Sequence, residues 1–218
     1  MLLFIAVFSL HYVTPLDEAK AFVNIGGEAN LPTWWNASLL FLVATLAVAA
    51  AFMAEGRRIR VSWSVIAAAA AFLSLDEAVA LHERLARPLA DARIWAVTYP
   101  WLVLGVVVAL VGSVVLILAG RSLPRATANR LAIALGCYAL GALGLEAFTG
   151  WIKNHGPEIL FSIGMFAEEG LEMLACIIAA TAVLDDLLNE RVGIGRGSVD
   201  GTAGDRQLRL ERTAHAER

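Results

Sequence analysis

Three glutamates stand inside an apolar segment that is long enough to cross a bilayer. Residues 161–184 read FSIGMFAEEGLEMLACIIAATAVL and include Glu168, Glu169 and Glu172. A carboxylate at membrane depth needs a proton, a basic side chain or a bound cation, because lipid supplies no water to solvate its charge. Proton transfer and cation binding are therefore the chemistries that this segment favours.

The three glutamates share one face of the expected helix. At about 100° per residue they fall within an arc of about 100°, with Glu172 in the middle. Apolar sequence flanks them on both sides. We expect this acidic stripe to face the interior of a helical bundle or a water-filled cavity.

Two other segments carry acids at a matching depth. Three acids lie 16 residues from the inner boundary of their segment: Asp76 from Arg60, Glu146 from Arg130 and Glu169 from Asp185. At the helical rise this separation is about 24 Å in each case. The equal distances predict one acidic layer that the three helices share in the outer half of the membrane.

The segment that holds Asp76 ends in SLDEAVALHERL. On a continuous helix Asp76 and Glu83 lie nearly one above the other, while Glu77 and His82 project to either side. We expect His82 and Glu83 near the outer water boundary, where a solvated helix end and a functional role are both open. The deeper Asp76, followed directly by Glu77, favours a functional role.

No lysine or arginine is expected at the depth of these acids. The nearest candidates in the sequence, Arg84 and Lys153, are expected near the outer surface. Packed carboxylates repel one another, so some of these acids hold protons unless a cation arrives. The pattern therefore favours a site for protons, metal ions or a cationic substrate.

The donor set indicates which cation the site prefers. Oxygen ligands favour Mg²⁺, Ca²⁺ or Mn²⁺, and an added imidazole shifts the preference toward Mn, Fe or Zn. We predict a divalent metal ion as cofactor, with Fe, Mn and Zn as candidates. Glu168 and Glu77 are the predicted catalytic acid and base. The predicted metal ligands are Asp76, His82, Glu83, Glu146, Glu169 and Glu172.

Known motifs do not account for these residues. The His-Glu-x-x-His pattern of zincins is absent, because no histidine follows His82-Glu83 at the required spacing. Glu168-Glu169 is similar to the paired glutamates that open the signature of CAAX-type intramembrane proteases, but Met173 stands where that family has an arginine. The later histidine motifs of that family are also missing, so we exclude this assignment.

The composition is typical of a multi-pass membrane protein. Hydrophobic residues make up 59% and charged residues 17% of the 218 residues, and the mean hydropathy is +0.69. The first apolar segment is short for a hydrocarbon core of about 30 Å, so we expect it to be truncated, tilted or partly inserted. The predicted fold is an all-α polytopic membrane bundle of about six transmembrane helices. Its segments are expected at about 1–14, 34–54, 61–83, 100–119, 130–150 and 161–186.

Charged and aromatic residues predict the orientation of these helices. Arginines gather in two short connections, which are therefore expected to be cytoplasmic: Arg57, Arg58 and Arg60, then Arg121, Arg125 and Arg130. Aromatic anchors are expected at the opposite ends, at Trp34, Trp35, Trp95, Tyr99, Trp101 and Trp151. We predict an inner (plasma) membrane protein with a transmembrane domain over residues 1–186. Residues 187–218, rich in glycine and mixed charge, are predicted to form a disordered cytoplasmic tail.

Small residues predict where the helices pack most closely. The alanines at positions 67–71 and the glycines Gly136, Gly141 and Gly144 offer surfaces that let neighbouring backbones approach. Tight packing of these two segments against residues 161–186 is expected to bring Asp76, Glu146 and Glu172 together.

Three functions fit this pattern. The favoured one is a metal-dependent membrane enzyme, a hydrolase or an oxidoreductase, that acts on a lipid or other membrane-partitioned substrate. A transporter or channel for protons or divalent cations is the second, although the inner halves of the segments are apolar and lack proline. A non-catalytic subunit or assembly factor is the third. The expected partners are membrane lipids and no nucleic acid, and the sequence leaves the oligomeric state open.

Overall fold

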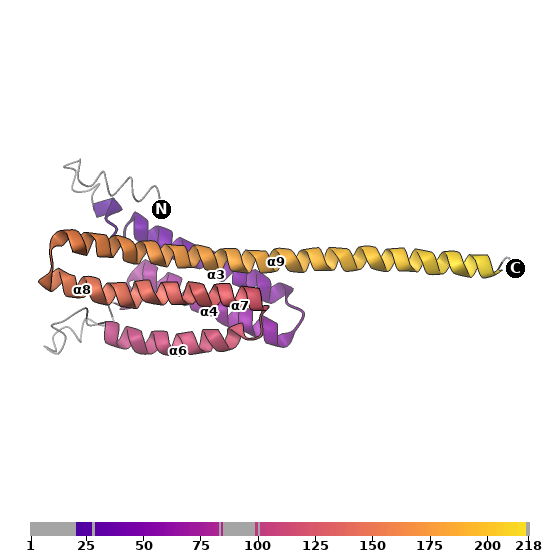
Figure 1. Ribbon diagram of the computed structural model, residues 1–218, viewed down its shortest axis with the longest axis horizontal. Coiled ribbons are helices and arrows are strands. Elements are labelled where there is room, and N and C mark those ends of the chain that lie inside the picture. Colours follow the sequence, from indigo (N-terminus) through magenta and orange to yellow (C-terminus); the bar gives the residue numbers. More distant parts are fainter. Residues whose placement is uncertain (1–20, 28, 83, 85–98, 100, 217–218) are drawn as a thin grey trace. The chain divides into compact units, whose positions relative to one another are not determined.

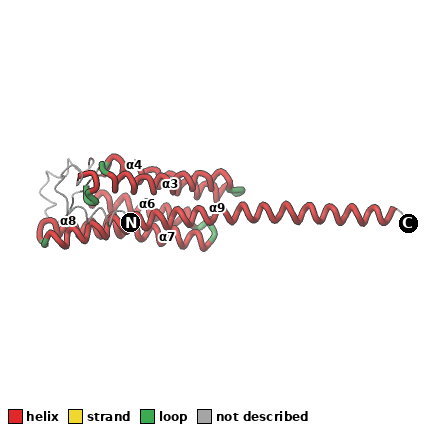
Figure 2. The backbone as a smooth tube through the Cα atoms, turned by 90° about the horizontal axis from the view of Figure 1, so that it is seen from above, coloured by secondary structure: helices red, strands yellow, loops and turns green. Residues whose placement is uncertain are grey.

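All elements that the structure describes are helices (Figures 1 and 2). The structure is a computed structural model that describes residues 21–27, 29–82, 84, 99 and 101–216, with side chains up to Asn189. No strand occurs in these ranges. The main helices are α3 (Leu31–Met53), α4 (Arg57–Val79), α6 (Leu102–Gly120), α7 (Arg125–Ala139), the π-helix η2 (Leu140–Leu145), α8 (Glu146–His155) and α9 (Glu158–Ala216).

Four helical stretches are long and apolar enough to cross a membrane. They are α3, α4, α6 and the run Arg125–His155, in which α7, η2 and α8 follow one another without a break. The prediction of an all-helical protein with membrane-length apolar segments is therefore confirmed. Residues 161–186, which carry the three glutamates, form part of α9. The predicted segment 1–14 lies outside the described residues.

The chain divides into two compact units, Met1–Val183 and Leu184–Arg218. The first unit contains the helices that surround the predicted site. In the second unit α9 continues as helical backbone to Ala216. The disordered tail from residue 187 stays a prediction. The glycine-rich composition behind that prediction carries low helix propensity.

Helix α3 begins with a polar cap that sets its position. The Asn30 side-chain oxygen accepts a hydrogen bond from the Thr33 backbone amide at 3.1 Å, and Pro32 stands in the first turn. The Asn30 amide donates in turn to the carbonyl of Gly27 at 2.6 Å. Such a cap satisfies backbone groups that the first helical turn leaves without partners. It also fixes the register that carries Asn36 into the bundle.

Small residues let α3 and α4 pack closely. Ala44, Ala47 and Ala50 are buried on α3, and Ala67 and Ala70 are buried on α4. The predicted role of the alanine run in helix packing therefore agrees with the observed burial. A hydrogen bond also joins the two helices, from the Ser74 hydroxyl to the Ala37 carbonyl at 2.8 Å.

The glycines of the α7–η2 run differ from the prediction. A Cβ added at Gly136 would meet no atom within 4 Å, and at Gly144 it would meet only Leu140 of the same run. Gly141 alone of the three faces α9, where an added Cβ would touch Glu172. The prediction of close helix contact is thus wrong for Gly136 and Gly144, because their faces point away from the neighbouring helix.

The arginine-rich connections lie at one end of the bundle. Figure 1 shows the α3–α4 and α6–α7 connections at the same end and the α8–α9 turn at the opposite end. At that turn the Gly156 backbone amide donates to the Ile152 carbonyl at 2.7 Å, and Pro157 precedes the first residue of α9. The acids of α9 therefore follow soon after the end that lies opposite the arginines.

The α3–α4 contact gives a first test. Ala47 is fully buried, whereas Ala49, two residues further along α3, is exposed. We expect Ala47→Leu to overpack the interface by about 1–3 kcal/mol and to lower the thermal unfolding midpoint in detergent. Ala49→Leu is the matched control and is expected to leave the midpoint unchanged. Equal midpoints for the two variants would contradict the observed packing.

Candidate functional site

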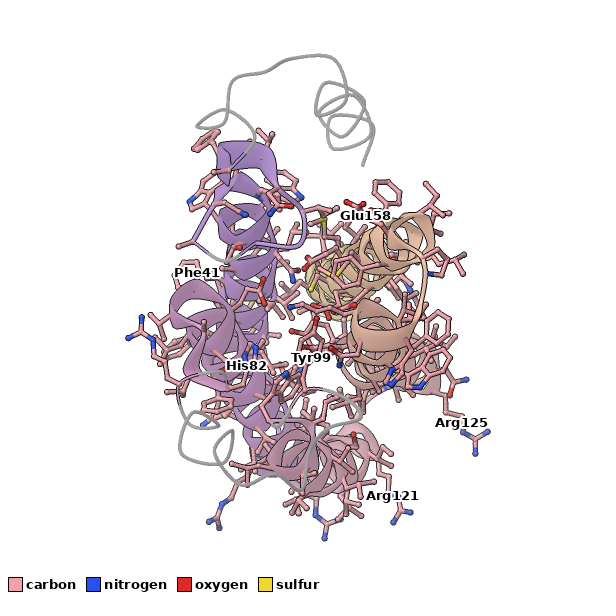
Figure 3. The ribbon with its side chains drawn as sticks, turned by 90° about the vertical axis from the view of Figure 1, so that its left-hand side faces the viewer. Phe41, His82, Tyr99, Arg121, Arg125 and Glu158 are labelled. Carbon is pink, nitrogen blue, oxygen red and sulfur yellow. The ribbon has the colours of Figure 1, made fainter. Side chains whose placement is uncertain are left out.

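One cavity of about 290 Å³ gathers the predicted acidic residues. Its walls come from α4, α6, α9 and the α7–η2–α8 run, and we name it the acidic cavity. The ionisable residues that line it are Asp76, Glu77, His82, Tyr138, Glu146, Glu168, Glu169 and Glu172. Glu83, the remaining predicted ligand, lies outside the described residues. Figure 3 views the bundle from the end nearest the α8–α9 turn and shows His82 among the helices.

Part of the wall of the acidic cavity is apolar. Helix α6 contributes Leu104, Val108 and Ala109 to it, and Phe72 and Leu73 come from α4. A cavity with charged and apolar parts can hold a molecule that has both a polar and an apolar part.

Two glutamates of α9 are buried and hydrogen-bonded to neutral donors. Thr149 donates through its hydroxyl to Glu168 Oε2 at 2.9 Å, and Asn36 donates through Nδ2 to Glu172 Oε2 at 3.1 Å. Both donor residues are fully buried. Among the described residues, neither glutamate forms an ion pair with a lysine or arginine. Two buried acids without a basic partner favour a proton or a cation as the neutralising group.

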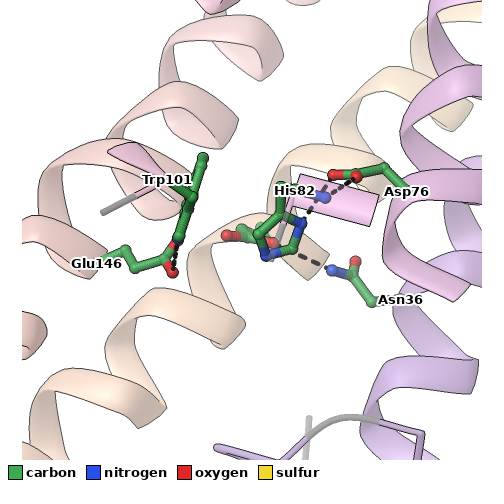
Figure 4. Close-up of polar contacts among 6 residues, drawn as sticks. Asn36, Asp76, His82, Trp101 and Glu146 are labelled. Carbon is green, nitrogen blue, oxygen red and sulfur yellow. Dashed lines mark hydrogen bonds and ion pairs between the residues drawn. The ribbon is translucent and has the colours of Figure 1, made fainter. Parts of the chain in front are cut away.

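Asp76 holds His82 in a defined orientation. One Asp76 oxygen accepts from the His82 backbone amide at 2.8 Å, and the other lies 3.0 Å from His82 Nδ1 (Figure 4). A carboxylate on one ring nitrogen fixes the orientation of an imidazole and directs its Nε2 to the other side. The pair can therefore present Nε2 for proton transfer or for metal binding.

The pair forms because α4 ends earlier than the sequence predicts. Ala80 adopts a left-handed conformation with φ of 48°, and its amide donates to the Asp76 carbonyl. The prediction of a continuous helix through residue 83 is therefore wrong. The turn at Ala80 brings His82 back over Asp76, and the hydrogen bonds that result offset the cost of about 1–2 kcal/mol for that conformation.

Trp101 connects His82 to Glu146. The Trp101 indole Nε1 donates to Glu146 Oε1 at 2.8 Å, and the rings of His82 and Trp101 have their centroids 4.6 Å apart (Figure 4). Gly105, one turn further along α6, leaves room for the Trp101 ring, with which an added Cβ would overlap. This chain of contacts joins the end of α4 to the start of α8.

A π-helix precedes Glu146. In η2 the wider turn changes the register of the run Arg125–His155, and Glu146 is the first residue after it. Within η2, an added Cβ at Gly141 would lie 2.8 Å from Glu172 Cγ and 3.2 Å from the Glu168 carbonyl oxygen. Short π-helical segments inside α-helices occur frequently at functional sites. Here the segment lies directly against the acids of α9.

Sequence reasoning missed three polar residues of the site. It assigned Trp101 to the aromatic belt and gave Asn36 and Thr149 no role. Asn36 and Thr149 are polar residues within membrane-length apolar runs, and this is the signal that could have identified them. The signal for Trp101 is Gly105, a small residue one helical turn away.

The donor atoms are not grouped around one point. No set of three histidine, cysteine, aspartate or glutamate side chains in the described part of the chain is arranged to hold a metal ion. The predicted ligands share the cavity, but Asp76 is engaged by His82, and Glu146 by Trp101. Metal binding in this cavity therefore requires some of these side chains to change rotamer.

The substitution Gly141→Ala tests whether the close approach of Gly141 to Glu172 contributes to stability. We expect Gly141→Ala to lower the thermal unfolding midpoint in detergent, because the new Cβ lies against Glu172 and the α9 backbone. Gly136→Ala on the same run is the matched control, since its Cβ enters open space. The control is expected to be neutral or stabilising by up to about 1 kcal/mol, the difference in helix propensity. A stable Gly141→Ala protein would contradict the close packing.

Comparisons with known proteins define a family. A family model described as "Domain of unknown function (DUF8692)" matches residues 1–187, so the chain belongs to this family. The comparisons with curated proteins and with solved structures gave no match. The matched range contains every residue of the acidic cavity.

Proposed function

We propose that this member of the DUF8692 family is an integral membrane enzyme that acts on a lipid or other membrane-partitioned substrate in the acidic cavity. The observation that carries the proposal is that six carboxylates and a histidine from separate helices line one cavity that also has an apolar wall. Acids at membrane depth are costly and mark functional sites in membrane proteins. An apolar wall beside them favours a substrate that comes from the bilayer.

The proposed enzyme crosses an inner (plasma) membrane about six times. Four described helical stretches have the required length, and the segments 1–14 and 161–186 supply the other two spans. The arginine-rich connections then face the cytoplasm together with the C-terminus. In this orientation the acidic cavity lies in the outer half of the membrane.

His82 is the proposed proton carrier or metal ligand, and Asp76 is its positioning residue. This assignment changes the role of Asp76, because both of its carboxylate oxygens contact His82. Glu168 and Glu77 stay proposed as acid and base groups. Glu168 is suited to proton transfer, since its hydrogen bond to Thr149 fixes one carboxylate oxygen in a buried setting.

A divalent Fe, Mn or Zn ion is the proposed cofactor. Its candidate ligands in the described chain are His82, Glu146, Glu169 and Glu172, which all line the acidic cavity. Such an ion neutralises buried carboxylates, and it can polarise a substrate oxygen or lower the pKa of a bound water. Glu83 stays a proposed ligand from outside the described residues.

An ion transporter receives less support from the same cavities. A second cavity borders the acidic one on the side of the arginine-rich connections, and most of its lining residues are apolar. A proton or a hydrated cation needs polar groups along its path through the membrane. The described residues therefore favour a site that is entered from the outer side or from the lipid.

The metal content of the purified protein tests the proposed cofactor. We expect protein purified in a mild detergent to contain a transition metal, or to bind Mn²⁺ or Zn²⁺ after chelation and reloading. Glu172→Gln is expected to reduce the bound metal at least tenfold, a change of about 1.4 kcal/mol or more. The matched control Glu55→Gln changes an exposed glutamate between α3 and α4 and should bind as the wild type does. Wild-type protein that cannot be loaded would refute the metal proposal.

The lipids of expressing cells test the enzymatic proposal. We expect mass spectrometry to find a lipid that cells with the wild-type protein consume, together with a product. His82→Gln is expected to lower the conversion by about 10²–10⁴-fold, the range for loss of an acid–base group. Glu158→Gln, at the exposed start of α9, is the control and should convert lipid normally. Unchanged lipids together with divalent-cation flux in liposomes would support transport instead.

A further inference from the structure

A second cavity, which we name the apolar chamber, adjoins the acidic cavity. It has a volume of about 310 Å³ and lies among α3, α4, α6, α7 and α9. Its walls are mostly aliphatic, and residues from four of these helices are Val43, Ile66, Leu131 and Ala175. The chamber contains none of the carboxylates of the acidic cavity.

The two cavities have a wall in common. Five residues line both of them: Ala69, Leu73, Leu116, Leu135 and Tyr138. A molecule bound across this boundary would place one part beside the carboxylates and the other part among aliphatic side chains. This arrangement matches the two parts of an amphiphile.

The length of the chamber fits a hydrocarbon chain. Along α7 the lining residues run from Tyr138 to Ala128, which is about 15 Å at the helical rise. This length equals half of a hydrocarbon core of about 30 Å, the depth that the chains of one leaflet occupy. At the far end of the chamber stand Arg121 and Asn129, near the arginine-rich connections.

The surroundings of the chamber determine what can fill it. An apolar cavity stays dry and binds apolar guests, because water finds no hydrogen-bond partners there. In a bilayer the apolar guests at hand are hydrocarbon chains. Helix α6 lines both cavities and is the least buried of the four membrane-length stretches. Within Leu102–Gly120, all of which is described, Leu102 alone is buried. Its sparse packing favours entry of a chain from the lipid beside it.

We propose that the substrate is an amphiphile whose hydrocarbon chain lies in the apolar chamber while its head group lies in the acidic cavity. This inference rests on the proposed function for the head-group site and extends it to the substrate class. The aliphatic chamber then selects a chain, and the carboxylates with His82 act on the head group. Tyr138, at the boundary, contacts the junction of the two parts.

Photo-crosslinking tests this proposal without requiring turnover. The probe is hexadecanol with a diazirine at mid-chain, a neutral molecule that makes no assumption about the charge of the head group. In nanodiscs we expect crosslinks to residues of α7 and α4 that line the chamber, between 128 and 138 and between 66 and 73. Crosslinks confined to the lipid-facing residues of α6 would overturn the proposal.

A variant whose larger side chain fills the chamber gives a second test, with a matched control on the same helix. Ala132 and Ala126 are both exposed alanines of α7, but Ala132 lines the chamber and Ala126 lines neither cavity. Ala132→Phe is expected to lower the crosslinking yield within the chamber about tenfold, while Ala126→Phe keeps the wild-type yield. Equal yields for the two variants would overturn the proposal. If Ala132→Phe fails to fold, Leu131→Trp, also on the chamber wall, takes its place under the same expectation.

The Glu172→Gln protein separates this inference from the proposed function. Glu172 lines the acidic cavity and not the chamber, so this variant is expected to crosslink as the wild type does. Chamber crosslinks without any lipid conversion would keep the chain site and refute the enzyme. Lipid conversion without chamber crosslinks would refute the chain site alone.

Discussion

The burial of carboxylates among apolar helices is the constraint on which the rest of this structure depends. Six acids line one cavity that α9 borders together with three stretches of membrane length: α4, α6 and the run Arg125–His155. The transfer of a charged side chain into hydrocarbon is unfavourable by several kcal/mol on any scale, so each acid requires a specific partner or a proton. The arrangement of polar residues in this bundle follows from that requirement.

The supporting contacts come from outside the acidic helix itself. Asn36 on α3 and Thr149 on α8 are fully buried, and each donates a hydrogen bond to one glutamate of α9. In the same cavity, His82 and Trp101 engage Asp76 and Glu146. Neutral donors hold the oxygens of Glu168 and Glu172 in place without neutralising a charge on them. For these two acids a proton or a bound cation is therefore the favoured neutralising group, and this makes the cavity suited to chemistry.

The glycines and the π-helix provide the space for these contacts. Gly141 allows Glu172 to approach η2, and Gly105 allows the Trp101 ring to lie against α6. The apolar chamber extends the cavity on the side away from the acids, with Tyr138 at the boundary. A charged compartment beside an aliphatic one explains why the enzyme proposal and the substrate class are linked.

Much of the helical framework was predictable, and the local turns were not. The depth match of Asp76, Glu146 and Glu169 predicted their convergence, because the helical rise is constant, and all three line one cavity. The turn at Ala80 could not be predicted, since alanine rarely adopts a left-handed conformation and gives no signal for it. The π-helix likewise has no distinct pattern in LGALGL. The contacts of Asp76 with His82 and of Glu146 with Trp101 were beyond the sequence, because they depend on side-chain positions that these turns create.

Labelling with dicyclohexylcarbodiimide tests most directly whether the buried acids hold protons that a cation can replace. This apolar reagent modifies protonated carboxyl groups that water does not reach, and mass spectrometry locates the modified residues. We expect labelling of Glu168 or Glu172 in the metal-free protein and suppression of that labelling by Mn²⁺ or Zn²⁺. The exposed Glu55 and Glu158 should stay unlabelled. The absence of label on α9, or labelling that divalent cations leave unchanged, would contradict a buried acidic site that protons and cations share.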